Sequence, residues 1–277
     1  MAYGLTADQV RRTNRPAPVA APWGSVTSLT EMAEYAMYRI DVMAGDSQPL
    51  HFFPSGYTAF LESGELAVRS LNSAGRSQAG TVLAGEVLPL PRFMVHGFSS
   101  APGAAVYLFG PRSSEGLQAF AVETAEAAEA AFHALKPAEL PHAGQPTTDV
   151  REKYWGRIET ILSDDVAAKR IFVRKGSQGS LEYHVEKRET YYIHSGLVRV
   201  GLRIGRAENR SIVMGPGESY DVRPCLMHLR IGLEDSVILE VSTRDSDSDS
   251  YLVEDGQTYR HIDVDSQSAT EQQEQPK

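Results

Sequence analysis

Short stretches in which apolar and polar residues alternate follow one another along most of the chain. Residues 157–162 (RIETIL) and 197–205 (LVRVGLRIG) are two of them, and Gly, Asp and Ser residues separate such stretches. A period of two is typical of β-strands with one buried face, and the small polar residues predict turns between them. The pattern therefore predicts an all-β protein of short antiparallel strands, arranged as jelly-roll barrels.

The chain also repeats itself. Four pairs of residues are each 132 positions apart: Trp23 and Trp155, Gly64 and Gly196, Gly85 and Gly217, and His96 and His228. His51 and His184 are 133 apart, which we interpret as one inserted residue. A fixed offset between several landmarks indicates two copies of one fold. We expect two tandem barrels, formed by residues 22–112 and 151–261.

Three further segments have a different composition. Residues 1–21 form a proline-containing arm, and residues 113–150 contain an Ala/Glu-rich stretch at 124–135 followed by a linker with three prolines. Alanine, glutamate and leucine favour a helix, and proline ends it, so a helix and a Pro-rich linker should join the two barrels. Residues 262–277 are acidic and polar, which predicts a disordered tail.

Charge and composition exclude several classes of function. The net charge of −9 argues against a nucleic-acid partner, because phosphates would be repelled. No apolar run approaches the roughly 20 residues of a membrane span, and the N-terminus lacks the apolar core of a signal peptide. We therefore expect a cytoplasmic protein without a membrane partner. The single cysteine, Cys225, excludes an internal disulfide or a cysteine-based zinc cluster.

The candidate chemistry lies in residues 181–196, LEYHVEKRETYYIHSG. If this stretch begins as a strand, Glu182, His184 and Glu186 point to the same face. Imidazole and carboxylate groups are ligands of divalent transition metals, and the predicted ligands of one ion are His184, Glu186, Glu189 and His228. Fe, Mn, Ni and Zn all suit this set.

Further residues near these ligands are candidates for the reaction itself. Glu182 or Glu186, whichever does not bind the ion, would act as the catalytic base. Arg223 and Arg230 would bind a phosphate or carboxylate of the substrate, together with Tyr191.

The first copy has a poorer ligand set. Tyr57 takes the position that Glu189 has in the second copy, so His51 and His96 are left without a carboxylate between them. We expect no metal ion in this copy. His51, Tyr57 and His96 are the candidates for a second site.

The second copy resembles the cupin superfamily, on the spacing of its ligands. Its first motif reads His184, Glu186 in place of the second His of that family, Glu189 and Gly196, and its second motif runs eleven positions from Gly217 to His228. KYWGRIETI, SLEYHVEKRETY and PGESYDV also resemble the cupin domain of type II mannose-6-phosphate isomerases, over roughly residues 153–259. The resemblance implies a bicupin with one metal site.

The same resemblance implies a reaction. It favours metal-dependent isomerisation of a small, sugar-like metabolite, in which a proton moves next to a carbonyl. An Fe- or Mn-dependent dioxygenase, decarboxylase or lyase of a small organic acid is the alternative, and a non-catalytic binding module is a third. Exposed strand edges in such folds are commonly covered by a second copy, so we also expect a homodimer.

Overall fold

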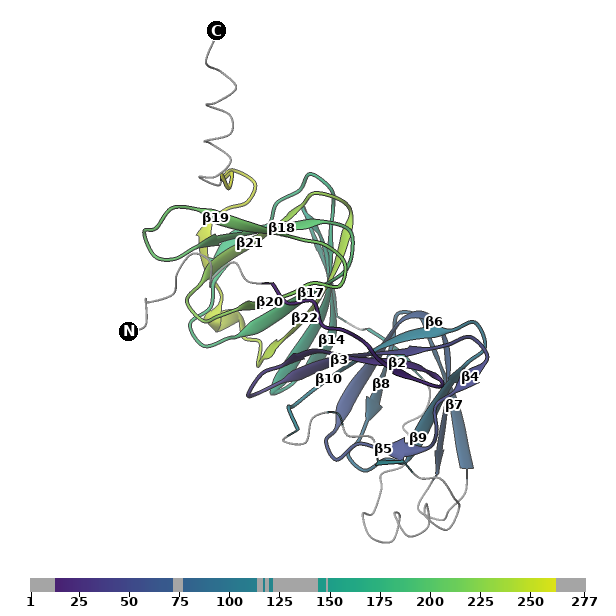
Figure 1. The fold of residues 1–277 in the computed structure, drawn as a ribbon. Helices are drawn as coiled ribbons and strands as arrows, with labels where there is room; N and C mark the ends of the chain where they lie inside the picture. Colours follow the sequence, from purple (N-terminus) through teal and green to yellow (C-terminus); the bar gives the residue numbers. More distant parts are fainter. Residues whose placement is uncertain are drawn as a thin grey trace. The chain divides into compact units, whose positions relative to one another are not determined.

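The computed structural model describes residues 13–71, 77–113, 117, 120–121, 144–147 and 149–262. The chain divides into two compact units (Figure 1). The N-terminal unit contains residues 16–149 with 160–162, and the C-terminal unit contains the N-terminal residues up to Arg15, residues 150–159 and those from Ser163 onward. Almost all regular structure in the described residues is β, as the alternating pattern predicted; the exception is a short 3-10 helix, η1 (Asp247–Asp249).

The N-terminal unit contains one extensive antiparallel sheet. Its central path is β1-β2-β3-β10-β6-β9-β5-β11, and β4, β7, β8 and β12 pair at its sides. The strands are β1 (Val19–Ala21), β2 (Gly24–Glu31), β3 (Ala36–Val42), β4 (Asp46–Ser47), β5 (His51–Phe52), β6 (Tyr57–Leu71), β7 (Ser77–Leu83), β8 (Glu86–Leu90), β9 (His96–Ser100), β10 (Ala104–Gly110), β11 (Phe120–Ala121) and β12 (Gln145–Pro146).

The C-terminal unit contains two sheets, with the orders β13-β14-β15-β22-β17-β20 and β19-β18-β21-β16-β23. Figure 1 shows β18, β19 and β21 facing the sheet that holds β17, β20 and β22. The strands are β13 (Val150–Lys153), β14 (Gly156–Ser163), β15 (Val166–Val173), β16 (Leu181–Tyr183), β17 (Glu189–Ser195), β18 (Val198–Arg203), β19 (Arg210–Met214), β20 (Ser219–Val222), β21 (Met227–Gly232), β22 (Ser236–Thr243) and β23 (Tyr251–Glu254).

The inward-facing residues of these strands form a separate core in each unit. In the C-terminal unit, Ile171, Ile193, Val200 and Ile238 are fully buried and come from both sheets. Burial of such side chains contributes about 1.5–3 kcal/mol each, so the alternating apolar positions hold the two sheets together. The buried polar residues of this unit lie among them and form the site described below.

The two units repeat the same pairing of strands. β10 pairs with β3 and β6 in the N-terminal unit, and β22 pairs with β15 and β17 in the C-terminal unit. His96 starts β9 and His228 lies in β21, at the offset of 132 that the sequence showed. Phe93 and Cys225, also 132 apart, have φ of 63° and 65°, a left-handed conformation that non-glycine residues seldom adopt. Both turns precede the histidine by three residues.

One predicted equivalence between the copies is wrong. His51 lies directly opposite His96, whereas the residue directly opposite His228 is Glu182, not His184. The local offset is therefore 182 − 51 = 131. Phe53 takes the position of His184, since 53 + 131 = 184. The inserted residue lies after this point, in the loop before Glu189.

The structure describes parts of the predicted arm, linker and tail. Asn14 in the predicted arm pairs with Ser219 at the edge of β20. The predicted helix at 124–135 lies outside the described residues, and part of the predicted linker, Gln145–Pro146, forms β12 against β8. The predicted tail, residues 262–277, lies outside the described residues except for Ile262. Among the described residues, none belongs to a helix with the length and apolar character that crossing a membrane requires.

Candidate metal centre

Three neighbouring segments of the C-terminal unit carry the candidate ligands. Glu182 lies on β16, and it is directly opposite His228 on β21. His184 follows the end of β16, after the strand has given way to a loop. One ligand atom from each of these three residues lies within 4.8 Å of the others. A carboxylate and two imidazoles therefore converge in a geometry that could hold one metal ion.

Hydrogen bonds fix how the two imidazoles present their nitrogens. His228 Nδ1 lies 2.9 Å from the carbonyl oxygen of Leu226, and His184 Nδ1 lies 2.8 Å from that of Asp249. A nitrogen beside a carbonyl oxygen must donate its proton, so Nε2 of each ring is the nitrogen that can bind a metal. Both rings are buried, which restricts their rotation further.

Glu189, at the start of β17, touches both imidazoles. Its Oε1 lies 2.9 Å from His228 Nε2, and its Oε2 lies 3.9 Å from His184 Nε2. The shorter approach is not aligned as a hydrogen bond, and His228 Nε2 has no hydrogen-bond partner in the described part of the chain. His228 Nε2 is buried and faces the carboxylates, and it could bind a metal ion once it has lost its proton. Glu189 is therefore placed to be a fourth ligand or to adjust the charge of the other three.

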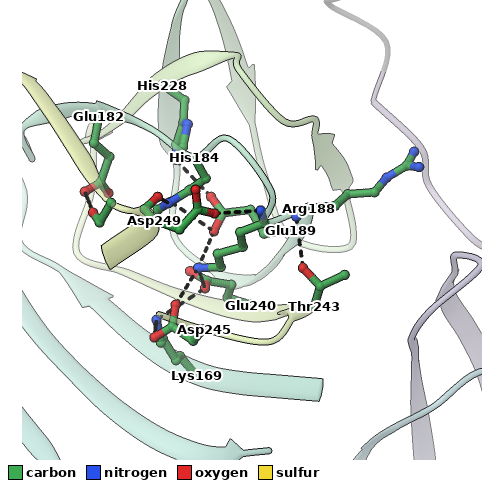
Figure 2. A network of polar contacts seen from close by, with 12 residues as sticks. Lys169, Glu182, His184, Arg188, Glu189, His228, Glu240, Thr243, Asp245 and Asp249 are labelled. Atoms are coloured by element: carbon green, nitrogen blue, oxygen red, sulfur yellow. Dashed lines mark hydrogen bonds and ion pairs between the residues drawn. The ribbon is translucent and has the colours of Figure 1, made fainter. Parts of the chain in front are cut away.

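A buried network of charges holds Glu189 in place. Lys187 Nζ lies 2.7 Å from Glu189 Oε2, 2.8 Å from Glu240 Oε1 and 3.0 Å from Asp245 Oδ1. Lys169 extends the network, at 2.6 Å from Asp245 (Figure 2). Burial alone would lower the pKa of Lys187, but the three carboxylates raise it well above its usual value. The ammonium group thus stays charged and anchors the carboxylate of Glu189.

The same charges set the protonation of the groups around Glu189. Burial would raise the pKa of Glu189, but Lys187, His228 and His184 hold it well below its usual value. Burial would lower the pKa of His228, and Glu189 raises it instead. Tyr191 donates a hydrogen bond to Glu189 Oε1 at 2.5 Å, and burial keeps its pKa well above 10. Tyr191 therefore carries a proton next to the candidate ligands.

Arg230 lies on β21, two residues after His228 and on the same face of the strand. Its Nη2 donates to Glu182 Oε1 at 3.0 Å, and its Nη1 donates to the Tyr191 hydroxyl at 3.2 Å. The guanidinium also lies 5.5 Å from the centre of the Trp155 ring. It is 8% exposed, so the candidate centre includes a buried cation beside its carboxylate ligand.

Asp249, in η1, organises the loop that carries His184. Its carboxylate accepts hydrogen bonds from the backbone N–H groups of Val185, Glu186 and Lys187, at 2.8–3.2 Å. Its carbonyl oxygen accepts the Nδ1 proton of His184. Figure 2 shows Asp249 beside His184. One residue thus fixes both the path of the loop and the orientation of a ligand.

Two residues predicted for the site lie outside it. Glu186, predicted as a ligand or a base, is exposed, because β16 ends at Tyr183 and the alternation on which the prediction rested stops there. Arg223, predicted to bind substrate, is exposed and lies 3.7 Å from Asp221. The structure brings together Glu182, His184, Glu189, Tyr191, His228 and Arg230.

Sequence reasoning missed the network residues Lys169, Lys187, Glu240, Asp245 and Asp249. Glu240 had a visible signal, because it is the one charged residue in the apolar run SVILEVST. Asp245 and Asp249 lie in a segment, RDSDSDS, whose composition is typical of a solvated chain. Their roles depend on contacts across more than 50 residues of sequence.

The second set of candidate residues lies in the N-terminal unit. His51 and His96 have ring centroids 4.4 Å apart, and Phe53 contacts both rings. Tyr57 contacts Phe53, at 5.4 Å between ring centroids. Burial lowers the pKa of His51 to about 4 and that of His96 well below its usual value. The two imidazoles are therefore neutral near pH 7.

Comparisons of the sequence with protein-family models and with curated proteins found no match. Solved structures match over most of the chain. A structure that describes the substrate binding mode of oxalate decarboxylase has a TM-score of 0.66 at 15% identity, over 86% of this chain and 77% of that one. A structure used to study the Mn(II) centres of Bacillus subtilis oxalate decarboxylase has a TM-score of 0.64 at 15% identity, over 93% and 80%.

At these identities the likeness shows a shared fold with these structures. The comparisons give no support to the finer resemblance to type II mannose-6-phosphate isomerases. The predicted cofactor, one divalent metal ion of open identity, agrees with the Glu182–His184–His228 group, which could hold one ion.

Proposed function

We propose that the protein is a metal-dependent enzyme that removes a carboxyl group from a small organic acid. The observation that carries the proposal is the position of Arg230, a buried guanidinium 3.0 Å from the candidate ligand Glu182. A cation beside a metal centre binds a carboxylate and orients it. The shared fold with oxalate decarboxylase supports the same class of reaction, one of the alternatives that the sequence left open.

In this proposal Glu182, His184 and His228 hold the ion, and Glu189 is the fourth candidate ligand. A divalent ion bound there would supply a Lewis acid that withdraws electrons from the substrate. Breaking the bond between the carboxyl group and its neighbouring carbon releases CO₂ and leaves an electron pair on that carbon. Tyr191 carries a proton that this carbon could accept, and Arg230 lies 3.2 Å from the same hydroxyl. Tyr191 is therefore the proposed acid.

Aldose–ketose isomerisation, the function that the sequence favoured, is a second candidate. The observation in its favour is the 2.5 Å contact between Tyr191 and Glu189, because a hydroxyl and a carboxylate in contact can pass a proton between adjacent carbons. The two reactions differ in whether CO₂ is released, which a direct assay decides.

A homodimer, a cytoplasmic location and a small-molecule substrate remain predictions.

The experiment measures metal content and product together. Protein purified without chelator should contain about one equivalent of a divalent metal and should release CO₂ from a panel of small dicarboxylic and 2-oxo acids. His228→Ala should lose most of the metal and the release of CO₂. His194→Ala, a histidine on β17 outside the ligand group, is the matched control and should retain both.

Two results would contradict the proposal. If His228→Ala retained its metal content, the metal would not be bound at the candidate centre. A metal-loaded protein that converts an aldose phosphate to a ketose, and releases no CO₂ from any acid of the panel, would replace decarboxylation by isomerisation.

A further inference from the structure

Arg230 keeps one hydrogen-bond donor that its neighbours do not use. Its Nη2 donates to Glu182 and its Nη1 to Tyr191, whereas its Nε is buried and has no hydrogen-bond partner in the described part of the chain. A buried N–H group is costly to leave unsatisfied, so it indicates an acceptor that the protein itself does not supply. A carboxylate oxygen of a bound acid is an acceptor of the right charge.

The ammonium groups of the centre are already engaged. Lys187 has three N–H donors, and its Nζ lies within 3.0 Å of three carboxylates. Lys169 Nζ lies 2.6 Å from Asp245 and 3.7 Å from Glu240. The protein's own carboxylates thus occupy both lysines, and Arg230 is the cation placed to bind a substrate.

The charges of the network that the described residues form leave room for one anion. Its cations are Arg230, Lys187 and Lys169, and its carboxylates are Glu182, Glu189, Glu240 and Asp245. The carboxylates outnumber the cations by one. A divalent ion bound to Glu182 and two neutral imidazoles would turn this deficit into a surplus of one positive charge, which a single carboxylate neutralises. A second carboxylate would restore an uncompensated negative charge in a buried place.

The side chains beside Arg230 and His228 on the inner face of the sheet are apolar. Val200 on β18 lies directly opposite Arg230, and Leu202 lies directly opposite His228. Ile212 on β19 lies directly opposite Val200. Directly opposite residues of antiparallel strands point to the same face, and all three apolar residues are buried. The part of a substrate that extends from Arg230 along this face therefore meets apolar side chains.

Among the described residues, the next cation on this face is too far away to bind a second carboxylate of a small acid. Arg210 on β19 lies directly opposite Leu202, so two strand spacings, about 10 Å, separate it from His228. Its Nη2 also lies 3.4 Å from Glu208. The two carboxylate carbons of a five-carbon diacid are at most about 5 Å apart. The second carboxylate of a short diacid would thus lie among the apolar side chains.

We propose that the substrate is a monocarboxylic acid whose remaining part is uncharged, an inference that rests on the function proposed above. Arg230 binds the carboxylate through its Nε, and the apolar side chains of Val200, Leu202 and Ile212 exclude a second charged group. The protein therefore discriminates against short dicarboxylates and phosphate esters.

The test compares, by calorimetry, the binding of three acids of equal chain length to the metal-loaded full chain. Pentanoate ends in a methyl group, glutaramate in an amide and glutarate in a second carboxylate. Pentanoate and glutaramate should each bind roughly tenfold or more tightly than glutarate at pH 7, because a second buried carboxylate without a cation is costly.

A pair of variants tests the role of Arg230. Arg230→Met should weaken the binding of pentanoate by roughly tenfold or more, because it removes the charge-assisted hydrogen bond. Arg203→Met is the matched control, since Arg203 follows Leu202 on β18 and faces the opposite side of the sheet. It should leave the binding of pentanoate unchanged.

The inference is overturned if glutarate binds as tightly as pentanoate or glutaramate, or if Arg230→Met retains its affinity for pentanoate. The comparison on the unaltered protein does not depend on the folding of a variant. Selective binding of monocarboxylates without release of CO₂ from any acid would contradict the proposed decarboxylation and leave this inference standing. Release of CO₂ from dicarboxylates alone would do the reverse.

Discussion

At the scale of single residues, the two glutamates on either side of His184 have opposite surroundings. Glu182 is opposite His228 and receives a hydrogen bond from Arg230, whereas Glu186 is exposed. Because a ligand must face the ion, only Glu182 belongs to the candidate centre. The difference between them can be measured directly.

Glu182→Gln should lower the affinity for the divalent metal by roughly tenfold or more, since it removes the negative charge from a ligand and from the partner of Arg230. Glu186→Gln, the same substitution four residues away, should leave the affinity within about twofold. Metal affinity measured by competition with a chelator checks both. Equal losses in the two variants would place Glu186 at the metal after all.

Asp245 provides a prediction on pH. Burial would raise its pKa, but Lys187 and Lys169 lower it to about 2, from an ordinary value of 3.8. A carboxyl group with a depressed pKa stabilises the folded state above its unfolded pKa, and this contribution is lost as the pH falls from about 4 to about 2. A shift of a little under two pKa units corresponds to about 2 kcal/mol, at about 1.36 kcal/mol per unit.

Asp245→Asn should therefore lower the free energy of unfolding by about 2 kcal/mol at pH 7, and by less at pH 3. Urea denaturation at the two pH values measures the difference. Asp165→Asn, at an exposed turn position, is the control and should change stability little at either pH. A cost for Asp245→Asn that does not shrink at pH 3 would contradict the ion-pair explanation.

At the scale of elements, the loop after β16 depends on η1. Residues 184–188 form no strand, and Asp249 binds three consecutive N–H groups of this loop while its carbonyl oxygen orients His184. Partners that orient a metal ligand typically contribute 10–100-fold to metal affinity. The short helix thus acts on the candidate centre through the loop.

Asp249→Ala should weaken the binding of the divalent metal by about tenfold, with little change in the fold of the strands. Asp247→Ala, an exposed aspartate of the same 3-10 helix, is the matched control and should bind normally. Metal titration and hydrogen exchange of residues 185–187 check the prediction together. Unchanged exchange rates in Asp249→Ala would mean that the loop holds its shape without this residue.

At the scale of the whole molecule, two units with the same strand pairing carry different chemistry. The C-terminal unit combines two histidines with Glu182, Glu189 and a network of lysines and an arginine. The N-terminal unit retains His51 and His96 in an aromatic environment. Corresponding positions of the two units carry different residues. Phe53 stands where the C-terminal unit has His184, and Tyr57 stands where it has Glu189. The N-terminal unit therefore lacks that imidazole and that carboxylate. The two units therefore share a strand arrangement but not a set of ligands.

The sequence by itself determined the features that depend on local periodicity and on fixed spacing. Alternation of apolar and polar residues specifies strands, because successive side chains point to opposite faces of a sheet. The offset of 132 residues located His96 and His228 in corresponding strands, and the motif spacing brought His184, Glu189 and His228 into one candidate site.

The tertiary structure alone decided which charged residues face inward. The end of β16 at Tyr183 turned Glu186 to solvent, and the pairing of β16 with β21 put Glu182 opposite His228. Lys187, Asp245 and Asp249 acquired their roles from partners far away in sequence. The physical reason is that side chains alternate between two faces only as long as the strand stays paired with its neighbour. In addition, the packing of the sheets decides which partner a buried charge meets.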